Sequence, residues 1–413
     1  MNLEYFIAKR LIKGGETKSS ISAPILKIAI AAIAIGLVMM LIAIASGVGL
    51  KEKIREKVAA FNGHIQIQNY DNNNSDVSTV PLPITQDFYP EFPDVEGIER
   101  IQAVATKGGI IRTEDTFEGM LAKGVGTDYN WRYFEDFLVE GALPNFSGDL
   151  NDEVLISSLK ANLLQLGVGD SFYAVFLKDN DPNKLPNNRR FKVVGIYDSG
   201  FEEFDRDIIF VDLRHIQRMN KWESTEVGHF EVFLEDFDDL EAKSNEIYGK
   251  TQSNLDTRNI KSEYYQIFEW IGLFDFNIAL IIGIMIIVGG INMITALLVL
   301  ILERTQMIGV LKALGSSNWS IRKVFIYNGA YLISLGLFWG NIIGLGLIFL
   351  QSKYRFLKFP NPEEYYIEYI PMQVNVPTII VLNLGVLMLC TLMLLVPSYA
   401  ISKIAPVKAI KFE

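Results

Sequence analysis

The stretch FNIALIIGIMIIVGGINMITALLVLIL, from Phe276 to Leu302, decides the fold of this chain, because it is long, apolar and free of charged residues. A helix that crosses a bilayer needs roughly 20 consecutive apolar residues. Three other uncharged stretches meet this requirement, and they run from Ala29 to Leu50, from Val324 to Ser352 and from Tyr369 to Ser402. The chain is therefore expected to be an α-helical membrane protein with four transmembrane helices.

The composition agrees with a membrane protein. Half of the 413 residues are hydrophobic and the mean hydropathy is +0.22, which is unusual for a soluble chain. A polar arm, Met1 to Lys27, precedes the first apolar stretch. Because that stretch is much longer than the apolar core of a secretory signal, it is interpreted as an uncleaved anchor.

The short basic segments predict the orientation. Lys and Arg favour the cytoplasmic side of a membrane, and they gather in the arm, in the loop after the second stretch and in the tail, as Lys9, Arg10, Lys13, Lys18, Lys27, Arg304, Lys312, Arg322, Lys323, Lys403, Lys408 and Lys411. Both termini are then cytoplasmic. We expect residues 51–270 to lie on the outer side of the membrane.

Residues 51–270 predict a large α+β domain inserted between the first and second helices. Alternating patterns indicate strands, and helical spacing indicates helices. The expected strands are 64–70, 98–111, 153–156, 172–177, 191–196 and 229–234, and the expected helices are 158–166 and 236–248. We expect two subdomains, one made of 61–112 with 227–258 and one inserted at 113–226.

The expected outer domain is strongly acidic. Residues 51–271 contain 40 acidic and 23 basic side chains. Such a charge excludes nucleic acid as a partner and favours a basic protein or simple solubility. The single cysteine, Cys390, lies in the last apolar stretch, so no disulfide is expected in this domain.

The sequence contains no evident catalytic or metal site. It has no phosphate-binding loop that ends in Gly-Lys-Ser or Gly-Lys-Thr, and His64, His215 and His229 lie far apart without metal-ligand spacing. We therefore expect no enzyme activity, no metal and no bound cofactor. Any chemistry of ATP and Mg²⁺ would belong to a partner chain.

The loop after the second apolar stretch, ERTQMIGVLKALGSSNWS from Glu303 to Ser320, has amphipathic helical spacing. Its apolar side chains, Met307, Val310, Leu311 and Leu314, would dock on lipid or in a groove of a soluble partner. Periodicity does not choose between the two.

Two further patterns concern helix surfaces. Gly336, Gly340 and Gly344 recur at every fourth position of the third stretch, which predicts close helix packing. In the first stretch, a bulky face contains Met39, Met40, Leu41 and Ile44. Flexible methionines suit a surface that accepts acyl chains, although methionine also faces bulk lipid.

Several motifs, taken together and in order, resemble the lipoprotein-releasing ABC transporter permease family of the LolC and LolE type, which is related to macrolide-exporter (MacB) and cell-division (FtsX) permeases. They are Phe6–Arg10, Ser46–Leu50, Phe61–Ile65, Ile291–Ile294, Glu303–Arg304 with Ile308–Gly315, Pro397–Tyr399 and Pro406–Glu413. The resemblance covers nearly the whole chain. It implies an FtsX-like permease domain at 271–413, with transmembrane helices near 272–302, 324–350 and 376–400.

The resemblance also implies functional segments. Residues 303–320 would be a coupling helix on a cytoplasmic ATPase dimer, with contacts from Glu303, Arg304, Met307, Ile308, Gly309, Leu311, Lys312, Leu314 and Gly315. A second permease subunit, identical or different, would complete a cavity for lipid chains lined by Met39, Met40, Leu41, Ile44 and Val48. The polar excursion 178–190 corresponds to a loop that contacts a periplasmic lipoprotein carrier in one subunit type, with Pro182, Leu185, Pro186 and Arg189 as candidates.

The expected function is that of a permease subunit that extracts lipoproteins from the inner membrane for a periplasmic carrier, driven by ATP hydrolysis in a partner. Two alternatives remain open from the sequence. One is a permease of a MacB-type efflux pump. The other is an FtsX-type permease that transmits a signal to a cell-wall hydrolase without transporting anything.

Overall fold

The computed structural model describes residues 3–13, 22–72, 75–113, 116–176, 186–361 and 365–404 of the chain. The chain divides into two compact units. The first, which we call the helical unit, contains Met1–Lys51, Trp270–Lys358 and Tyr369–Glu413. The second, the sheet unit, contains Glu52–Glu269 and Phe359–Glu368. A short segment from the last third of the sequence thus belongs to the sheet unit.

Among the residues that the structure describes, four helices are long and apolar enough to cross a membrane, which confirms the four predicted spans. They are α2 (Ser22–Asn62), α9 (Tyr265–Glu303), α11 (Asn318–Tyr354) and the run of α13 (Val376–Met393), α14 (Leu395–Ser398) and α15 (Ala400–Lys403). The last span is interrupted where Pro397 has no N–H to donate to the carbonyl of Met393, the last residue of α13.

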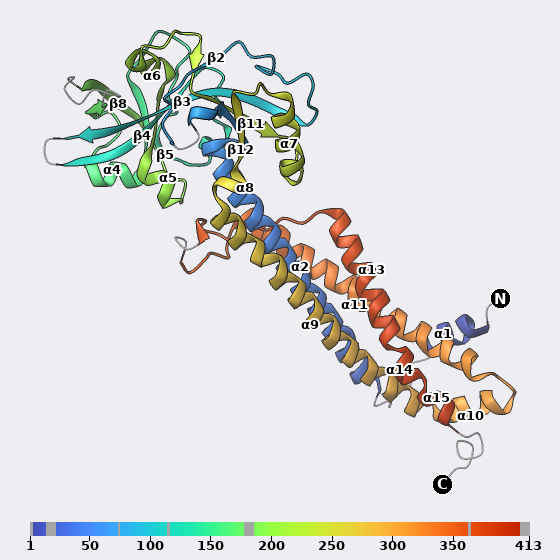
Figure 1. The fold of residues 1–413 in the computed structure, drawn as a ribbon. Coiled ribbons are helices and arrows are strands. Elements are labelled where there is room, and N and C mark those ends of the chain that lie inside the picture. Colours follow the sequence, from blue (N-terminus) through green and yellow to red (C-terminus); the bar gives the residue numbers. More distant parts are fainter. Residues whose placement is uncertain are drawn as a thin grey trace. The chain divides into compact units, whose positions relative to one another are not determined.

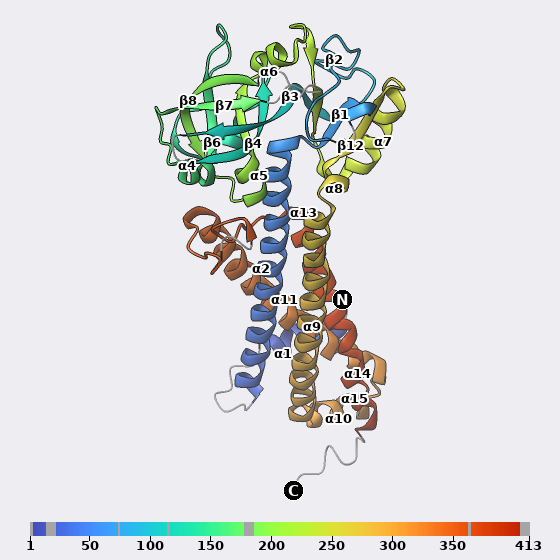
Figure 2. The ribbon, with the colours of Figure 1, turned by 60° about the vertical axis from the view of Figure 1, so that its left-hand side comes forward.

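Helices α2 and α9 lie side by side in both views of the fold (Figures 1 and 2). The core of the helical unit is formed by buried apolar side chains from all four spans, among them Leu37, Ala45, Met293, Phe325, Cys390 and Leu394. The amino-terminal arm, expected only as a polar segment, contains α1 (Leu3–Lys13). Its Ala8 is buried, and Tyr5 contacts Tyr327 of α11 edge-on at 6.4 Å between ring centroids.

The glycine face of α11 lies against α2. A Cβ atom on Gly336 would stand 2.8 Å from side-chain atoms of Ile33, and one on Gly340 would stand 3.0 Å from the Ala34 carbonyl oxygen. Gly344 approaches Leu41 equally closely. The two helices can be this near only because these positions have no side chain.

Gly340→Leu is expected to lower the free energy of unfolding by about 1–3 kcal/mol, since the new side chain must push α2 away. The measurement is thermal unfolding of the full-length protein in detergent. Gly346→Leu is the matched control, because nothing lies within 4 Å of a Cβ at that position of the same helix. Equal destabilisation by both substitutions would contradict the close approach.

The sheet unit is built on a ten-stranded, mostly antiparallel sheet in the described part of the chain, with strand order β12-β1-β11-β3-β4-β9-β6-β8-β5 and with β7 paired to β3 and β8. Its strands are β1 (Ile65–Asn69), β3 (Ile98–Arg112), β4 (Phe117–Val125), β5 (Leu138–Gly141), β6 (Glu153–Ser157), β7 (Ser171–Phe176), β8 (Asn187–Tyr197), β9 (Ile208–Asp212), β11 (His229–Leu234) and β12 (Leu255–Asn259). A separate ladder pairs β2 (Leu82–Pro83) with β10 (Glu226–Val227). All six predicted strands are confirmed.

The sheet unit also contains short helices, several of which are labelled in Figure 1. They are α3 (Arg132–Glu135), α4 (Ser158–Leu164), α5 (Glu202–Asp207), α6 (Leu213–Asn220), α7 (Leu240–Lys250) and α8 (Ile260–Glu263), with 3₁₀ turns η1 (Tyr70–Asn72) and η2 (Phe237–Asp239). Helix α6 packs on β3 and β4, and α7 packs on β12. The two predicted helices are confirmed as α4 and α7, although α7 begins later because Asp236 starts the 3₁₀ turn instead.

Strands from both expected subdomains share the one sheet. Strand β3 of the segment 61–112 pairs from Val104 to Arg112 with β4 of the segment 113–226. The core between the two expected subdomains contains aromatic side chains. Phe61, at the end of α2, stacks on Phe204 at 4.7 Å and meets Phe134 edge-on at 5.2 Å between ring centroids.

Candidate functional site

The predicted coupling segment, 303–320, is divided in the structure. Its helix is α10 (Thr305–Ala313), and residues 318–320 already belong to α11. The helix ends where Ser316 N–H donates to the Leu311 carbonyl and Gly315 adopts a φ of +88°, a conformation that favours glycine. Ser317 then caps α11 by accepting the N–H of Ser320.

Helix α10 presents two different faces. Ile308 and Gly309 are buried, and Met307 and Leu311 pack partly against the core of the helical unit. The opposite face contains Val310 and Leu314, of which 44% and 77% are exposed. Glu303 and Gly315 are also exposed, while Arg304 is half-buried. Several of the nine candidate residues are therefore buried or half-buried. The exposed surface of this segment includes Val310 and Leu314.

Lys312 has an intramolecular role that the sequence did not reveal. Its ammonium group donates to the carbonyls of Ile401 and Ile404 at 2.7 and 2.8 Å, at the end of the last span. Arg322 of α11 donates to the Ser402 hydroxyl and lies 4.7 Å from the centre of the Tyr399 ring. Lys312 thus satisfies carbonyls at the end of the last span, and Arg322 bonds a side chain of the same segment. They connect α10, α11 and α15.

The lipid-cavity candidates on α2 occupy unlike environments. Met40, Leu41 and Ile44 are buried within the helical unit, and Val48 is half-buried against its core. Met39 is 46% exposed. It continues an outward stripe with Ile28 and Ile35, which are 67% and 64% exposed. Of the five candidates, Met39 alone is exposed on the described surface, as part of this stripe.

The carrier-contact candidates lie around the β7–β8 hairpin. Pro182 and Leu185 fall outside the described residues. Pro186 is exposed and directly precedes β8. Arg189 is half-buried and lies on the same strand face as the buried Phe191.

The opposite face of that hairpin carries a row of four exposed side chains that the sequence did not bring together. The strand register places Phe117 opposite Arg112, Arg112 opposite Tyr173, and Tyr173 opposite Arg190. Directly paired residues share one face of a sheet. Phe117 and Tyr173 are 73% and 59% exposed, and both arginines are exposed. We call these four residues the basic aromatic row.

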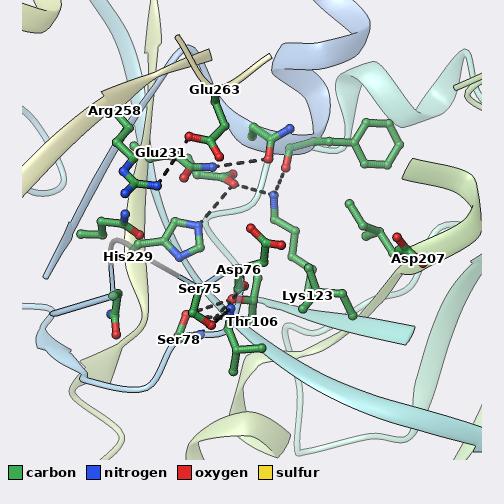
Figure 3. Close-up of a pocket in the computed structure, with 18 of the residues that line it drawn as sticks. Ser75, Asp76, Ser78, Thr106, Lys123, Asp207, His229, Glu231, Arg258 and Glu263 are labelled. Atoms are coloured by element: carbon green, nitrogen blue, oxygen red, sulfur yellow. Dashed lines mark hydrogen bonds and ion pairs between the residues drawn. The ribbon is translucent and has the colours of Figure 1, made fainter. Parts of the chain in front are cut away.

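A polar cavity of about 300 Å³ lies inside the sheet unit (Figure 3). It is lined by β4, β11, α5 and the ends of α2 and α8. On its wall Lys123 and Glu231 form a buried ion pair at 2.6 Å. Figure 3 shows His229 beside Glu231, at 3.7 Å between the ring Nε2 and the carboxylate. Burial opposes ionisation of Glu231, but Lys123 and His229 together hold the pKa of this carboxyl below its ordinary value.

A second polar cluster of the sheet unit surrounds Tyr366. The ring of Tyr366 stacks on Phe201 at 4.1 Å. Lys57 donates to the carbonyls of Ser199 and Tyr366 at 2.5 and 2.6 Å. The buried Asp205 accepts the Ser199 hydroxyl at 2.7 Å. Burial raises the pKa of Asp205 to about 6, although the Ser199 hydrogen bonds oppose this, and Asp198 raises it further.

Asp205 makes stability depend on pH. Its folded-state pKa lies above its ordinary value, so the folded state binds more protons and stability falls as pH rises from about 4 to 6. For Asp205→Asn, stability relative to wild type is expected to rise by on the order of 3 kcal/mol between pH 4 and pH 7. Thermal unfolding at both pH values checks this. Asp207→Asn, on the exposed side of the same helix, is the control, and a pH-independent difference for Asp205→Asn would contradict it.

The described residues contain no group of three or more His, Cys, Asp or Glu side chains that could hold a metal ion. The described structure instead presents exposed surfaces and hydrogen-bonded contacts between helix ends and their neighbours. These are the exposed face of α10, the basic aromatic row, and the contacts that attach helix ends to their neighbours.

Comparison with known proteins gives matches in both units. Residues 28–254 match the family model of the MacB-like periplasmic core domain, and residues 279–406 match that of the FtsX-like permease C-terminal domain. The lipoprotein-releasing system transmembrane protein LolC of Xylella fastidiosa (strain Temecula1) is 21% identical over 406 residues, which cover 92% of each chain. LolC of Neisseria meningitidis serogroup B is 21% identical over 445 residues, covering 100% of each. Among solved structures, the extracellular domain of the noncanonic ABC-type transporter YknZ from Gram-positive bacteria aligns at 13% identity and a TM-score of 0.31, covering 47% of this chain and 99% of that one.

Proposed function

We propose, since the chain belongs to the family of ABC transporter permeases that join a MacB-like periplasmic core domain to an FtsX-like C-terminal permease domain, that it is the membrane subunit of an ATP-driven lipoprotein-releasing complex. The observation that carries this proposal is the similarity to lipoprotein-releasing transmembrane proteins over 92–100% of the chain. It includes both the helical unit and the sheet unit. The complex would lie in the bacterial inner membrane, with the sheet unit in the periplasm and both termini in the cytoplasm.

The energy of the task explains why such a permease needs an ATPase. Removing an acyl chain from a bilayer costs about 0.8 kcal/mol for each buried CH₂ group. A lipoprotein with several long chains therefore does not leave the membrane at a useful rate on its own. Permeases of this family work with an ATPase and with a second permease, and the hydrolysis of Mg-ATP would occur in the ATPase.

The exposed face of α10 is the proposed contact with the ATPase. Val310 and Leu314 offer apolar side chains that an interface would bury. Because Lys312 attaches α10 to the end of the last span, a displacement of α10 would also move α15. The ATPase would thus act on two membrane helices through one short helix.

The stripe of Ile28, Ile35 and Met39 on α2 is the proposed boundary with the second permease or with the acyl chains of the cargo. All three side chains are apolar, and methionine adapts to varied shapes. The contacts of Met40, Leu41 and Ile44 within the bundle support a role for these three in packing rather than in a preformed cavity.

The basic aromatic row, together with the exposed Pro186 that precedes β8, is the proposed contact with a periplasmic lipoprotein carrier. Aromatic and arginine side chains are enriched where proteins bind one another. The row is also a positively charged patch on a strongly acidic domain. It suits a carrier surface with acidic side chains and apolar grooves.

Depletion of this protein in its host tests the proposal. Inner and outer membranes are separated, and several lipoproteins are followed in each fraction. Accumulation of lipoproteins in the inner membrane is expected. Normal lipoprotein sorting would reject the proposal, and drug sensitivity or a division defect in the same cells would then identify an efflux permease or a hydrolase-controlling permease.

A further inference from the structure

The end of α2 is fixed to the sheet unit by buried side chains. The last carbonyls of a helix lack partners within the helix. In α2 the Phe61 carbonyl accepts the ammonium group of Lys123 at 2.5 Å, and the Ala60 carbonyl accepts the hydroxyl of Tyr129 at 3.1 Å. Lys123 lies on β4, and Tyr129 follows that strand. Both donors therefore come from the same part of the sheet.

The same contacts extend to β11. Lys123 and Glu231 are paired at 2.6 Å, with only 3% and 1% of their side chains exposed. Gln102, fully buried on β3, donates to the other oxygen of Glu231 at 2.8 Å. Gly63, in the left-handed region at a φ of +65°, lies so near Glu231 that a Cβ would stand 2.9 Å from it. The end of α2 thus contacts β4 and β11, and Gln102 of β3 holds Glu231 in place.

The start of the second connecting helix is bonded to the same place. The N–H of Ile260, the first residue of α8, donates to the His64 carbonyl at 3.1 Å, two residues after the end of α2. Strand β12, which leads into α8, pairs with β1, which follows α2. The two chain segments that connect the sheet with α2 and α9 therefore share one anchorage.

A buried ion pair is a costly way to gain stability, because the loss of hydration offsets much of the attraction. Its geometry is nevertheless rigid, since each charged group has several fixed partners. We propose that Lys123, held by Glu231, is a positioning residue that makes the end of α2 move with β4 and β11 as one body. This inference rests on the proposed function, because it concerns how motion driven by the ATPase reaches the sheet.

The test combines Lys123→Met with Glu231→Gln in the full permease, assembled with its ATPase in nanodiscs. The double substitution removes both buried charges together, keeps an acceptor for Gln102 and removes the cap on the Phe61 carbonyl. We expect a melting temperature close to that of wild type, ATP hydrolysis within about twofold of wild type, and lipoprotein release per ATP hydrolysed lowered at least tenfold. Release per ATP within twofold of wild type would overturn the inference.

Lys160→Met is the matched control. Lys160 is as buried as Lys123 and donates to a carbonyl of the same strand, that of Gly119, at 2.8 Å. It does not contact the end of α2 in the described structure. Release per ATP should remain unchanged in this variant, and an equal loss would show that any damage to β4 has the same effect and would overturn the inference.

Hydrogen exchange separates this inference from the proposed function. In the wild-type complex, trapping the ATPase with ATP and vanadate should change exchange in the last turn of α2 and in β4 together. In the double variant the change should persist in α2 and disappear from β4. If wild type releases no lipoprotein, the proposed function fails, while the exchange result still decides the role of Lys123. If the change in hydrogen exchange persists in β4 of the double variant, Lys123 does not have the proposed positioning role.

Discussion

Leu314→Asp is expected to weaken the association of the permease with its ATPase about 10- to 30-fold. At ATPase concentrations below the dissociation constant, the rate of permease-dependent ATP hydrolysis should fall by the same factor. Leu314 is 77% exposed at the end of α10, next to the exposed Val310. Replacing a central apolar contact of an interface typically costs about 2 kcal/mol or more, and 1.4 kcal/mol corresponds to a factor of ten. A carboxylate also adds a desolvation penalty when the interface closes.

The measurement is titration of the purified ATPase onto the permease in nanodiscs, followed by ATP hydrolysis. Val139→Asp is the matched control, because Val139 is a similarly exposed apolar residue, at 64%, on β5 of the sheet unit. It should leave both values unchanged. Normal binding and hydrolysis with Leu314→Asp would show that α10 does not dock the ATPase.

Lys312 illustrates how far a sequence carries the prediction of this site. The 3.6-residue periodicity predicts a helix after Glu303, and the glycine at 315 predicts its end. Periodicity does not reveal that the carbonyls of Ile401 and Ile404 lie beside Lys312, because the two segments are separated by the third and fourth spans. The prediction therefore counted Lys312 among the residues available to a partner, whereas the structure uses it within the chain.

The same limit applies to the spans and the sheet. Length and absence of charge predict α2, α9, α11 and α13, because the bilayer imposes both. Alternation of apolar and polar residues in the sequence predicts β1 and β11, although every residue of β11 is buried in the structure. It does not predict that β4 pairs in parallel with β9, or that strands from both expected subdomains share one sheet. Those pairings depend on contacts between distant segments, which no local pattern records.

The basic aromatic row could not be predicted from the sequence for the same reason. Arg112, Phe117, Tyr173 and Arg190 come from four strands and become neighbours only through the register of β3, β4, β7 and β8. The sequence instead indicated residues 178–190, with Arg189 among them, as the contact with a carrier. In the structure Arg189 belongs to the strand face of the buried Phe191, because side chains alternate along a strand, and Arg190 takes the exposed position.

Arg112→Glu combined with Arg190→Glu is expected to lower the rate of transfer of lipoprotein to the carrier about tenfold, while ATP hydrolysis by the complex is unchanged. Each exposed ion pair contributes about 0.2–1 kcal/mol. Reversing two charges replaces attraction with repulsion, so a loss near 1.4 kcal/mol is reasonable, and it corresponds to a factor of ten. Much of the loss should appear in the association rate and should diminish at high salt, because exposed charges act over a Debye length.

Arg218→Glu combined with Lys221→Glu makes the same change in net charge at the exposed end of α6 and serves as the control. If transfer depends on the local row, only the first pair of substitutions slows it. If transfer depends on the overall charge of the sheet unit, both pairs slow it equally, and the row is not the contact. Tyr173→Ala then tests the apolar part of the surface, since its effect should persist at high salt while that of the arginines fades.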